Sequence, residues 1–201
     1  MSQICLVRHG ETDWNAEGKI QGRTDISLNA TGKRQAEECA QYFSNSEWDR
    51  IVTSPLKRAK QTANIMNQSL QIPVIEMEEF VERCYGDAEG LTREERQRLY
   101  PQRRDIPNQE PRNLLAQRVM KGMERIQEEY PNDKIILVAH GGVINTILAV
   151  LSNGEIGSGK TKLINACISN LHFMENQWNI QEYNQVHHLS QYNEYRGEQN
   201  E

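Results

Sequence analysis

The stretch Lys134-Ile135-Ile136-Leu137-Val138-Ala139, followed by His140-Gly141-Gly142, is the most strongly apolar run of this 201-residue sequence. A nearly continuous run of aliphatic and β-branched residues is typical of a parallel strand that is covered on both faces. Residues 3–7 and 48–53 form two shorter runs of the same kind. We therefore expect all three runs to be buried strands of one sheet.

Helical patterns lie between and after these runs. They cover residues 31–45, 55–70, 114–130 and 143–151. Thr31 and Ser54 are the expected N-caps of the first two helices. Near the C-terminus, residues 166–174 and 178–183 are predicted to form two further strands joined by a turn. Strands that alternate with helices in this way predict an α/β fold of three layers, in which a mostly parallel sheet carries helices on both faces.

Length and composition favour a single domain. The chain is 37% hydrophobic and 25% charged, and a chain of this length buries roughly 70% of its unfolded surface, so its core needs neither a metal nor a disulfide. We expect one domain over residues 1–189. Within it, the charged and proline-containing residues 76–111 are expected to form a lid-like excursion, and residues 190–201 a polar, flexible tail.

The sequence also argues against several functional classes. A formal net charge of −5 argues against a protein that coats nucleic acid. No apolar run approaches the roughly 20 residues that span a bilayer, and a signal-peptide pattern is absent, so we expect a cytoplasmic protein without membrane contact. The four cysteines are widely spaced, which argues against a zinc site, a redox pair and a disulfide framework. Nothing in the sequence selects an oligomeric state.

Polar residues follow the first and third predicted strands. Ligands of parallel sheets bind beyond the carboxyl ends of the strands, so Arg8-His9-Gly10 and His140-Gly141-Gly142 are expected to face one crevice. Arg58, early in the second helix, is expected to point to the same place, and the glycines are expected to let a ligand approach the backbone. Two arginines and two histidines suit a tetrahedral dianion such as phosphate. The residues considered together are Arg8, His9, Asn15, Arg58, Glu82 and His140.

This combination predicts phosphoryl transfer through a histidine. A neutral imidazole nitrogen is a competent nucleophile toward phosphorus, and arginines neutralise charge on the transferring oxygens. A carboxylic acid would protonate the leaving oxygen and later take a proton from the attacking water. This chemistry needs no metal, and the sequence has no metal-ligand pattern such as H-x-x-x-H. Either histidine alone is more often a packing residue, so the prediction depends on the combination.

Four motifs stand in a fixed order along the chain. They are Leu6-Val7-Arg8-His9-Gly10-Glu11-Thr12 with Asn15, Gln21-Gly22 and Asp25; residues 28–36; residues 54–59 with 61–63; and Val138-Ala139-His140-Gly141-Gly142. Together they resemble the signature of the histidine phosphatase superfamily, the phosphoglycerate mutase-like enzymes, from residue 4 to about residue 190. Arg-His-Gly alone is a weak match, but the ordered series is specific. The resemblance implies a phosphoglycerate mutase-like fold.

The resemblance also implies roles for single residues. His9 would be the phosphorylated nucleophile, and Glu82 would be the acid and base. Glu82 is preferred to Glu78, Glu79 and Glu89 because it falls at the family's position before Gly86. The residues implied to bind the phosphoryl group or the rest of the substrate are Arg8, Asn15, Gln21, Gly22, Arg58, Arg83, Tyr85, His140 and Gly141.

Residues 154–161, Gly-Glu-Ile-Gly-Ser-Gly-Lys-Thr, match the P-loop pattern of nucleotide-binding proteins. That pattern needs a strand before it, a helix after it and a later acidic residue for magnesium. Here a helix is expected before the motif and a strand after it, and no aspartate follows Asp133. A glycine-rich surface loop is therefore the better interpretation.

Two activities of the family differ only in the acceptor of the phosphoryl group. Residues 82–86 resemble the cofactor-dependent mutases, which need 2,3-bisphosphoglycerate, although Cys84 replaces the usual histidine. Residues 86–90 resemble the family's phosphatases, although Ala88 replaces the usual aromatic residue. The pair Arg103-Arg104 is similar to paired arginines of the mutases, but an exposed basic pair is commoner.

Chain length favours the phosphatases over the mutases. Mutases of this family typically carry a longer lid and a longer C-terminal segment, which help to exclude water from the phosphoenzyme. We therefore predict a metal-independent phosphomonoesterase without cofactor that acts on a small phosphorylated metabolite. A mutase is the second choice, and a non-catalytic module that binds a phosphorylated ligand is the third.

Overall fold

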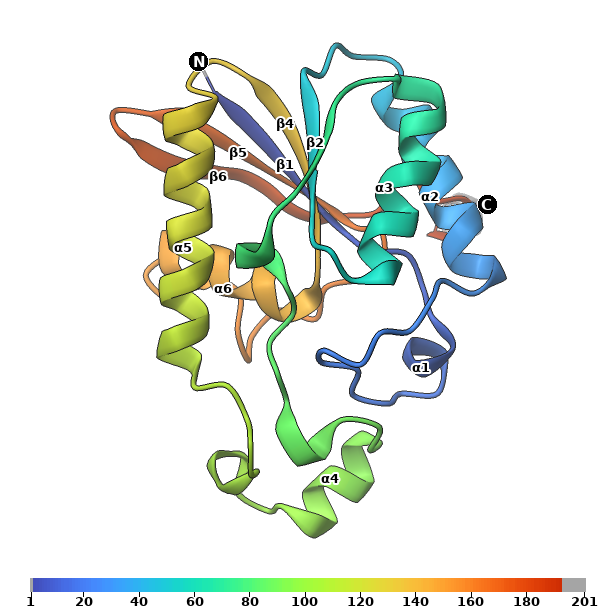
Figure 1. The fold of residues 1–201 in the computed structure, drawn as a ribbon, viewed down its shortest axis with the longest axis vertical. Helices are drawn as coiled ribbons and strands as arrows, with labels where there is room; N and C mark the ends of the chain where they lie inside the picture. Colours follow the sequence, from blue (N-terminus) through green and yellow to red (C-terminus); the bar gives the residue numbers. More distant parts are fainter. Residues whose placement is uncertain (1, 193–201) are drawn as a thin grey trace, which may run out of the picture.

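A six-stranded sheet forms the centre of the computed structural model, which describes residues 2–192 (Figure 1). In spatial order the strands are β3 (Val74–Glu76), β2 (Arg50–Thr53), β4 (Lys134–Ala139), β1 (Gln3–Arg8), β5 (Ile168–Met174) and β6 (Gln177–Gln185). The first four pair in parallel, whereas β5 is antiparallel to both β1 and β6. The prediction of a mostly parallel sheet is confirmed.

Helices cover both faces of this sheet (Figure 1). The pair α2 (Ala30–Phe43) and α3 (Lys57–Leu70) packs on one face, and the pair α5 (Arg112–Glu129) and α6 (Gly141–Leu151) packs on the other. Side chains of β1 alternate between the two cores: Ile4 and Leu6 join the core under α5 and α6, and Cys5 and Val7 join the core under α2 and α3. The predicted three-layer fold is confirmed.

Between β3 and α5 the chain leaves the sheet and forms what we call the projecting segment, residues 77–111 (Figure 1). It contains the helix α4 (Arg93–Leu99) and three short 3-10 helices, η1 (Glu78–Phe80), η2 (Gly86–Ala88) and η3 (Arg103–Asp105). One more short helix, α1 (Asp13–Ala16), follows β1. The segment corresponds to the excursion that the sequence predicts.

Two predicted helix starts are wrong. The N-cap of α2 is Asn29, not Thr31, because the Asn29 side chain accepts a hydrogen bond from the backbone N–H of Gly32. The helix α3 begins at Lys57 with Leu56 as N-cap, two residues after the predicted start, and Ser54 serves a different contact described below.

The edges of the sheet also differ from the prediction. The three-residue strand β3 was not predicted, because a run this short carries no alternation pattern. The predicted C-terminal hairpin is present, but its first strand begins at Ile168 and its turn is made by Glu175 and Asn176, both with positive φ. Most of the expected tail, residues 193–201, lies outside the described residues. Within residues 2–192, no helix has the length and apolar character needed to cross a membrane.

Candidate active site

His9 and His140 lie next to each other at the carboxyl ends of β1 and β4. The strands pair with Arg8 opposite Ala139, so the next residue of each strand is a histidine at the same level. The ring centroids are 5.2 Å apart, and the two residues are 3% and 0% exposed. Beyond this point the chain continues to α2 on one face and to α6 on the other, which opens a crevice between the strand ends.

The hydrogen bonds of His9 leave one ring nitrogen unused. Its Nδ1 lies 2.7 Å from the carbonyl oxygen of Gly10, and because a carbonyl only accepts, Nδ1 carries the proton. Nε2 therefore keeps its lone pair in the neutral ring. Burial, together with the charges of Arg58 and Arg8, holds the pKa of His9 well below the usual 6.5. The ring is thus neutral at pH 7 and has the form that a nucleophile needs.

The hydroxyl of Ser54 sets the tautomer of His140. Ser54 Oγ accepts a hydrogen bond from the backbone N–H of Leu56 at 3.3 Å and lies 2.7 Å from His140 Nε2. Among the described residues, Nε2 is the only acceptor within reach of the Ser54 hydroxyl proton. The buried hydroxyl is satisfied when it donates to Nε2, and the ring proton is then on Nδ1. That Nδ1 is buried and makes no hydrogen bond within residues 2–192. Burial and the Arg58 charge lower the pKa of His140 well below 6.5, so the residue offers a neutral N–H donor beside His9.

Backbone carbonyls hold Arg8 and Arg58 in place. Arg8 Nη1 donates to the carbonyl of Leu163 at 2.6 Å. Arg58 donates to the carbonyls of Thr24 and Gly22 at 2.9 and 2.6 Å. In both arginines Nε is buried and lacks a partner among the described residues. Two fixed cations with unused N–H groups suit the oxygens of a phosphoryl group.

Glu82 reaches the crevice from the projecting segment. The residue is 7% exposed, and its Oε2 and Oε1 accept hydrogen bonds from the backbone N–H groups of Gly142 at 2.9 Å and Arg83 at 2.8 Å. A Cβ at position 142 would lie 2.4 Å from Glu82 Oε1, so this contact requires a glycine. The carboxyl group is thereby fixed at the first turn of α6.

The glutamates that compete with Glu82 in the sequence have other contacts. Glu79 pairs with Arg125 at 3.3 Å, Glu89 accepts hydrogen bonds from backbone N–H groups, and Glu78 is exposed. Of the four, only Glu82 lines the cavity described below.

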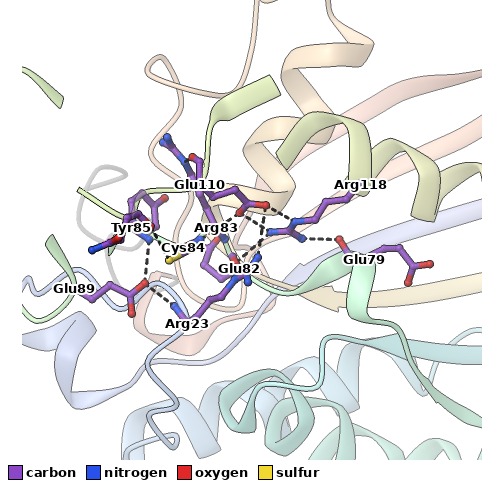
Figure 2. Close-up of polar contacts among 10 residues, drawn as sticks. Arg23, Glu79, Glu82, Arg83, Cys84, Tyr85, Glu89, Glu110 and Arg118 are labelled. Carbon is purple, nitrogen blue, oxygen red and sulfur yellow. Dashed lines mark hydrogen bonds and ion pairs between the residues drawn. The ribbon is translucent and has the colours of Figure 1, made fainter. Parts of the chain in front are cut away.

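A network around Glu110 and Arg118 anchors the backbone that carries Glu82 (Figure 2). Arg118 of α5 donates to both carboxylate oxygens of Glu110 at 2.7 and 3.0 Å, and to the carbonyls of Glu79 and Glu82 at 2.8 and 3.2 Å. Burial alone would raise the pKa of Glu110, but the hydrogen bonds from Arg118 lower it. Arg23 donates to the carbonyl of Glu82 at 3.3 Å. Glu82 is therefore tied to α5 through its backbone.

One cavity of about 1260 Å³ opens at this site. The predicted site residues that line it are Arg8, His9, Asn15, Gln21, Gly22, Arg58, Glu82, Arg83, Tyr85 and Gly141. His140 is fully buried and in contact with His9. Arg103 and Arg104 are exposed, as expected, yet they also line the cavity. Within residues 2–192, no group of three or more His, Cys, Asp or Glu side chains is placed to hold a metal ion.

Asn15 has a structural contact in addition to its place in the cavity. Its Oδ1 accepts hydrogen bonds from the backbone N–H of Thr12 at 3.1 Å and from Asn165 Nδ2 at 3.2 Å. Asn165 Nδ2 also donates to the carbonyl of His9. The carboxamide oxygen of Asn15 is thus occupied, so its Nδ2 group is the part that can serve a ligand.

Three supporting residues have roles that the sequence does not predict. Ser54 binds His140 instead of capping a helix, Thr62 accepts from the backbone N–H of Gly10 at 3.1 Å, and Asn165 ties α1 to β1. Their partners are between 52 and 156 residues away, so no local pattern marks them.

Gly10 does not have the predicted role of letting a ligand approach the backbone. A Cβ there would lie 2.3 Å from the carbonyl oxygen of Gly32, so Gly10 makes room for the first turn of α2 and not for a ligand.

The P-loop-like residues 154–161 form an irregular loop between α6 and β5. The next element after the loop is the strand β5 and not a helix, which agrees with the preference for a surface loop. Three of its glycines, at positions 154, 157 and 159, have positive φ. The sequence did not predict that residues 158–163 line the same cavity as His9.

Comparison with known families identifies the chain. The model of the histidine phosphatase superfamily (branch 1) matches residues 4–186. The chain belongs to this superfamily. The resemblance inferred from the ordered motifs is thereby confirmed.

Individual superfamily members show how close the similarity is. The chain is 51% identical over 190 residues to the uncharacterised phosphatase PhoE of Bacillus subtilis (strain 168), with 94% of this chain and 98% of that protein covered. It is 34% identical to a metal-independent phosphoserine phosphatase of Arabidopsis thaliana, with 94% and 84% covered. The solved structure of a phosphoserine phosphatase from Entamoeba histolytica in complex with 3-phosphoglyceric acid superposes with a TM-score of 0.83 at 30% identity, covering 94% of this chain and all of that one.

Proposed function

We propose that this protein is a phosphomonoesterase that hydrolyses small organic phosphates through a phosphohistidine on His9, without a metal ion or other cofactor. The observation that carries the proposal is the unprotonated Nε2 of His9 beside two arginines and unused N–H donors. Relatives named as phosphatases support hydrolysis, and one of them is named metal-independent. The substrate we propose is a small phosphorylated metabolite of the cytoplasm.

The first step transfers the phosphoryl group to the enzyme. His9 Nε2 forms a bond to phosphorus while the bond between phosphorus and the leaving oxygen breaks. Arg8 and Arg58 donate their unused N–H groups to the transferring oxygens, and the N–H of His140 adds a neutral donor. Glu82, in its carboxylic acid form, gives its proton to the leaving oxygen, so the product leaves as an alcohol.

The second step returns the enzyme to its starting state. Glu82, now a carboxylate, takes a proton from a water molecule as that water attacks phosphorus. The bond between Nε2 of His9 and phosphorus breaks, and inorganic phosphate is released. Each turnover thus consumes one phosphate ester and one water molecule.

We further propose that residues 1–189 act as one catalytic domain and that the projecting segment is its lid. This proposal is supported by the single sheet and by the contacts that join Glu82 of the projecting segment to α6.

Two measurements on p-nitrophenyl phosphate and a radiolabelled phosphate ester test the mechanism. His9→Ala should lower turnover at least about 10³-fold, because the nucleophile is lost. A denaturing quench during turnover should trap a phosphoenzyme that acid hydrolyses and base preserves, with the label on the peptide that contains His9. Retained turnover, or an acid-stable label, would contradict the phosphohistidine.

A second experiment separates the phosphatase from a mutase, the alternative that Arg83 and Tyr85 favour because both line the cavity. The protein is incubated with 3-phosphoglycerate and a catalytic amount of 2,3-bisphosphoglycerate. We expect inorganic phosphate as the product. Accumulation of 2-phosphoglycerate instead would assign the protein to the mutases.

A further inference from the structure

The cavity is strongly cationic beyond the surroundings of His9. Eleven lysine and arginine residues but only two glutamates line it, although the formal net charge of the chain is −5. Both glutamates are already engaged, Glu82 by backbone N–H groups and Glu110 by Arg118. The transfer of one phosphoryl group uses Arg8 and Arg58, so most of these cations have no function in it.

Arg96 of α4 is the clearest unexplained cation. It lines the cavity and is only 7% exposed. Its side chain makes no hydrogen bond or ion pair within residues 2–192. Its guanidinium nitrogens are not among the fully buried polar atoms that lack a partner, so the group faces the cavity. A cation that the protein leaves unpaired at a cavity wall can bind an anion that enters the cavity. An anionic ligand in the cavity would supply the missing acceptor.

Arg93 and Arg103 bring further positive charge to the same place. Arg93 precedes Arg96 by three residues on α4, and Arg103 belongs to η3. Both line the cavity, and neither makes an ion pair within the described part of the chain. Burial and the charges of these two arginines lower the pKa of Arg96. Three arginines from two elements therefore meet with no acidic partner.

The size of the cavity agrees with a ligand that extends past the site at the sheet edge. Its volume of about 1260 Å³ exceeds the roughly 300–1,000 Å³ of typical small-molecule sites. His9 stands at the end of β1, whereas the three arginines belong to the projecting segment. The cavity thus carries two groups of cations on different parts of the fold.

We propose that Arg93, Arg96 and Arg103 form a second anion subsite, which binds a phosphate group of the substrate other than the one transferred to His9. The substrate class is then a small metabolite with two or more phosphate groups. Several guanidinium groups match the charge and the oxygens of a phosphate dianion, whereas a carboxylate offers one charge and two oxygens. This inference rests on the proposed phosphatase activity.

The test compares substrates that differ by one phosphate group. Hydrolysis of glucose 1,6-bisphosphate and of glucose 6-phosphate is followed by release of inorganic phosphate, with p-nitrophenyl phosphate as a reference that has a single phosphate. The wild-type protein is expected to have a KM about tenfold lower or better for the bisphosphate. Arg96→Met should raise that KM about 10- to 100-fold, the effect of losing a charge-assisted hydrogen bond. The kcat of Arg96→Met for the bisphosphate should stay within about twofold of the wild-type value. Its kcat and KM for p-nitrophenyl phosphate should do the same.

Two further variants keep the test decisive. Arg98 lies on the same helix as Arg96 but is exposed and does not line the cavity, so Arg98→Met is the matched control and should change no constant. Because Arg96 is buried, its replacement could prevent folding, which circular dichroism would reveal. Arg103→Gln alters an exposed member of the subsite and should raise KM for the bisphosphate alone.

Three outcomes would overturn the subsite. The first is an equal KM for the two glucose phosphates in the wild-type protein. The second is a parallel rise of the KM for p-nitrophenyl phosphate in the folded variants. The third is an equal rise, in Arg103→Gln, of the KM for 3-phosphoglycerate, whose second anion is a carboxylate. All three leave turnover of p-nitrophenyl phosphate by the wild-type protein intact. Failure of the proposed function would instead appear as the absence of that turnover.

Discussion

Arg58 and Arg96 line the same cavity and are both almost fully buried, at 1% and 7% exposure, but their guanidinium groups differ in their contacts. Arg58, at the sheet edge, donates to the carbonyls of Gly22 and Thr24. Arg96, in the projecting segment, has no acceptor within the described residues. One cation is held by the protein, and the other is left unpaired at the cavity wall.

The difference separates two tasks within one cavity. Donors that stabilise a transition state work best when their direction is fixed before the substrate arrives, because no reorganisation is then needed during the reaction. The backbone contacts of Arg8 and Arg58 meet this requirement. Donors that only hold a distant part of the substrate contribute mainly to binding. Substitutions at the sheet edge should therefore lower kcat, whereas substitutions of the unpaired arginines should raise KM.

Replacing Arg58 should have the largest effect. Arg58→Met removes a cation beside the transferring oxygens and leaves the carbonyls of Gly22 and Thr24 without their donor. We expect kcat/KM for p-nitrophenyl phosphate to fall on the order of 10³-fold and the free energy of unfolding to fall by about 2–4 kcal/mol. Steady-state kinetics and urea denaturation measure the two effects. A loss of activity no larger than that of Arg96→Met on this substrate would erase the distinction between the two arginines.

Gly142→Ala should break the contact that joins the sheet edge to the projecting segment. The new Cβ would lie 2.4 Å from Glu82 Oε1 and 3.1 Å from the Tyr85 hydroxyl, so the carboxyl group must move. Because Glu82 is proposed to protonate the leaving oxygen, kcat should fall about 10- to 100-fold for alkyl phosphates. The decrease should be smaller for p-nitrophenyl phosphate, whose leaving group needs little protonation.

Glu82→Gln provides the comparison for that variant. It should show the same dependence on the leaving group, and adding Gly142→Ala should lower kcat no further, because both changes remove one function. Equal losses for alkyl and nitrophenyl leaving groups would assign the acid to another residue.

The sheet-edge site could be predicted from the sequence because its residues follow strands. A strand pattern fixes where a residue such as His9 or His140 emerges, and the parallel pairing of β1 and β4 brings the two together. The tautomers could not be predicted, since they depend on Ser54 and on the carbonyl of Gly10, whose positions relative to the rings come from the fold. Periodicity therefore predicts the neighbours in the sheet but not the hydrogen bonds between them.

The projecting segment could be predicted only in outline. Its charge and its prolines mark it as an excursion from the sheet, but nothing in its sequence separates Arg96, which is buried in the cavity, from Arg98, which is exposed. Both are basic residues in the last turn of one short helix with a polar sequence. Glu82 could be chosen among neighbouring glutamates only through the family resemblance, because its partner Gly142 is 60 residues away.

Arg118→Met tests whether the anchor of Glu82 matters for catalysis. The variant loses the hydrogen bonds to Glu110 and to the carbonyls of Glu79 and Glu82. We expect kcat to fall about three- to tenfold and limited proteolysis of the projecting segment to become faster. Arg125→Met is the matched control, because Arg125 also lies on α5 and contacts Glu79, but through an ion pair in which its side chain is 45% exposed. Similar behaviour of the two variants would show that the anchor has no effect on Glu82.

The smallest effect should be a change in the titration of His9, without any change in the fold. Burial and the charges of Arg58 and Arg8 hold its pKa well below 6.5, so the ring stays neutral as the pH falls through 6.5. Removing the Arg58 charge should raise the pKa toward the usual value. In NMR titrations with carbon-13-labelled histidine, the His9 midpoint should be higher in Arg58→Met than in the wild type and unchanged in Arg96→Met. The two arginines line the same cavity, but only Arg58 is among the charges that act on His9. A midpoint near 6.5 in the wild-type protein would mean that the sheet edge does not keep its nucleophile neutral.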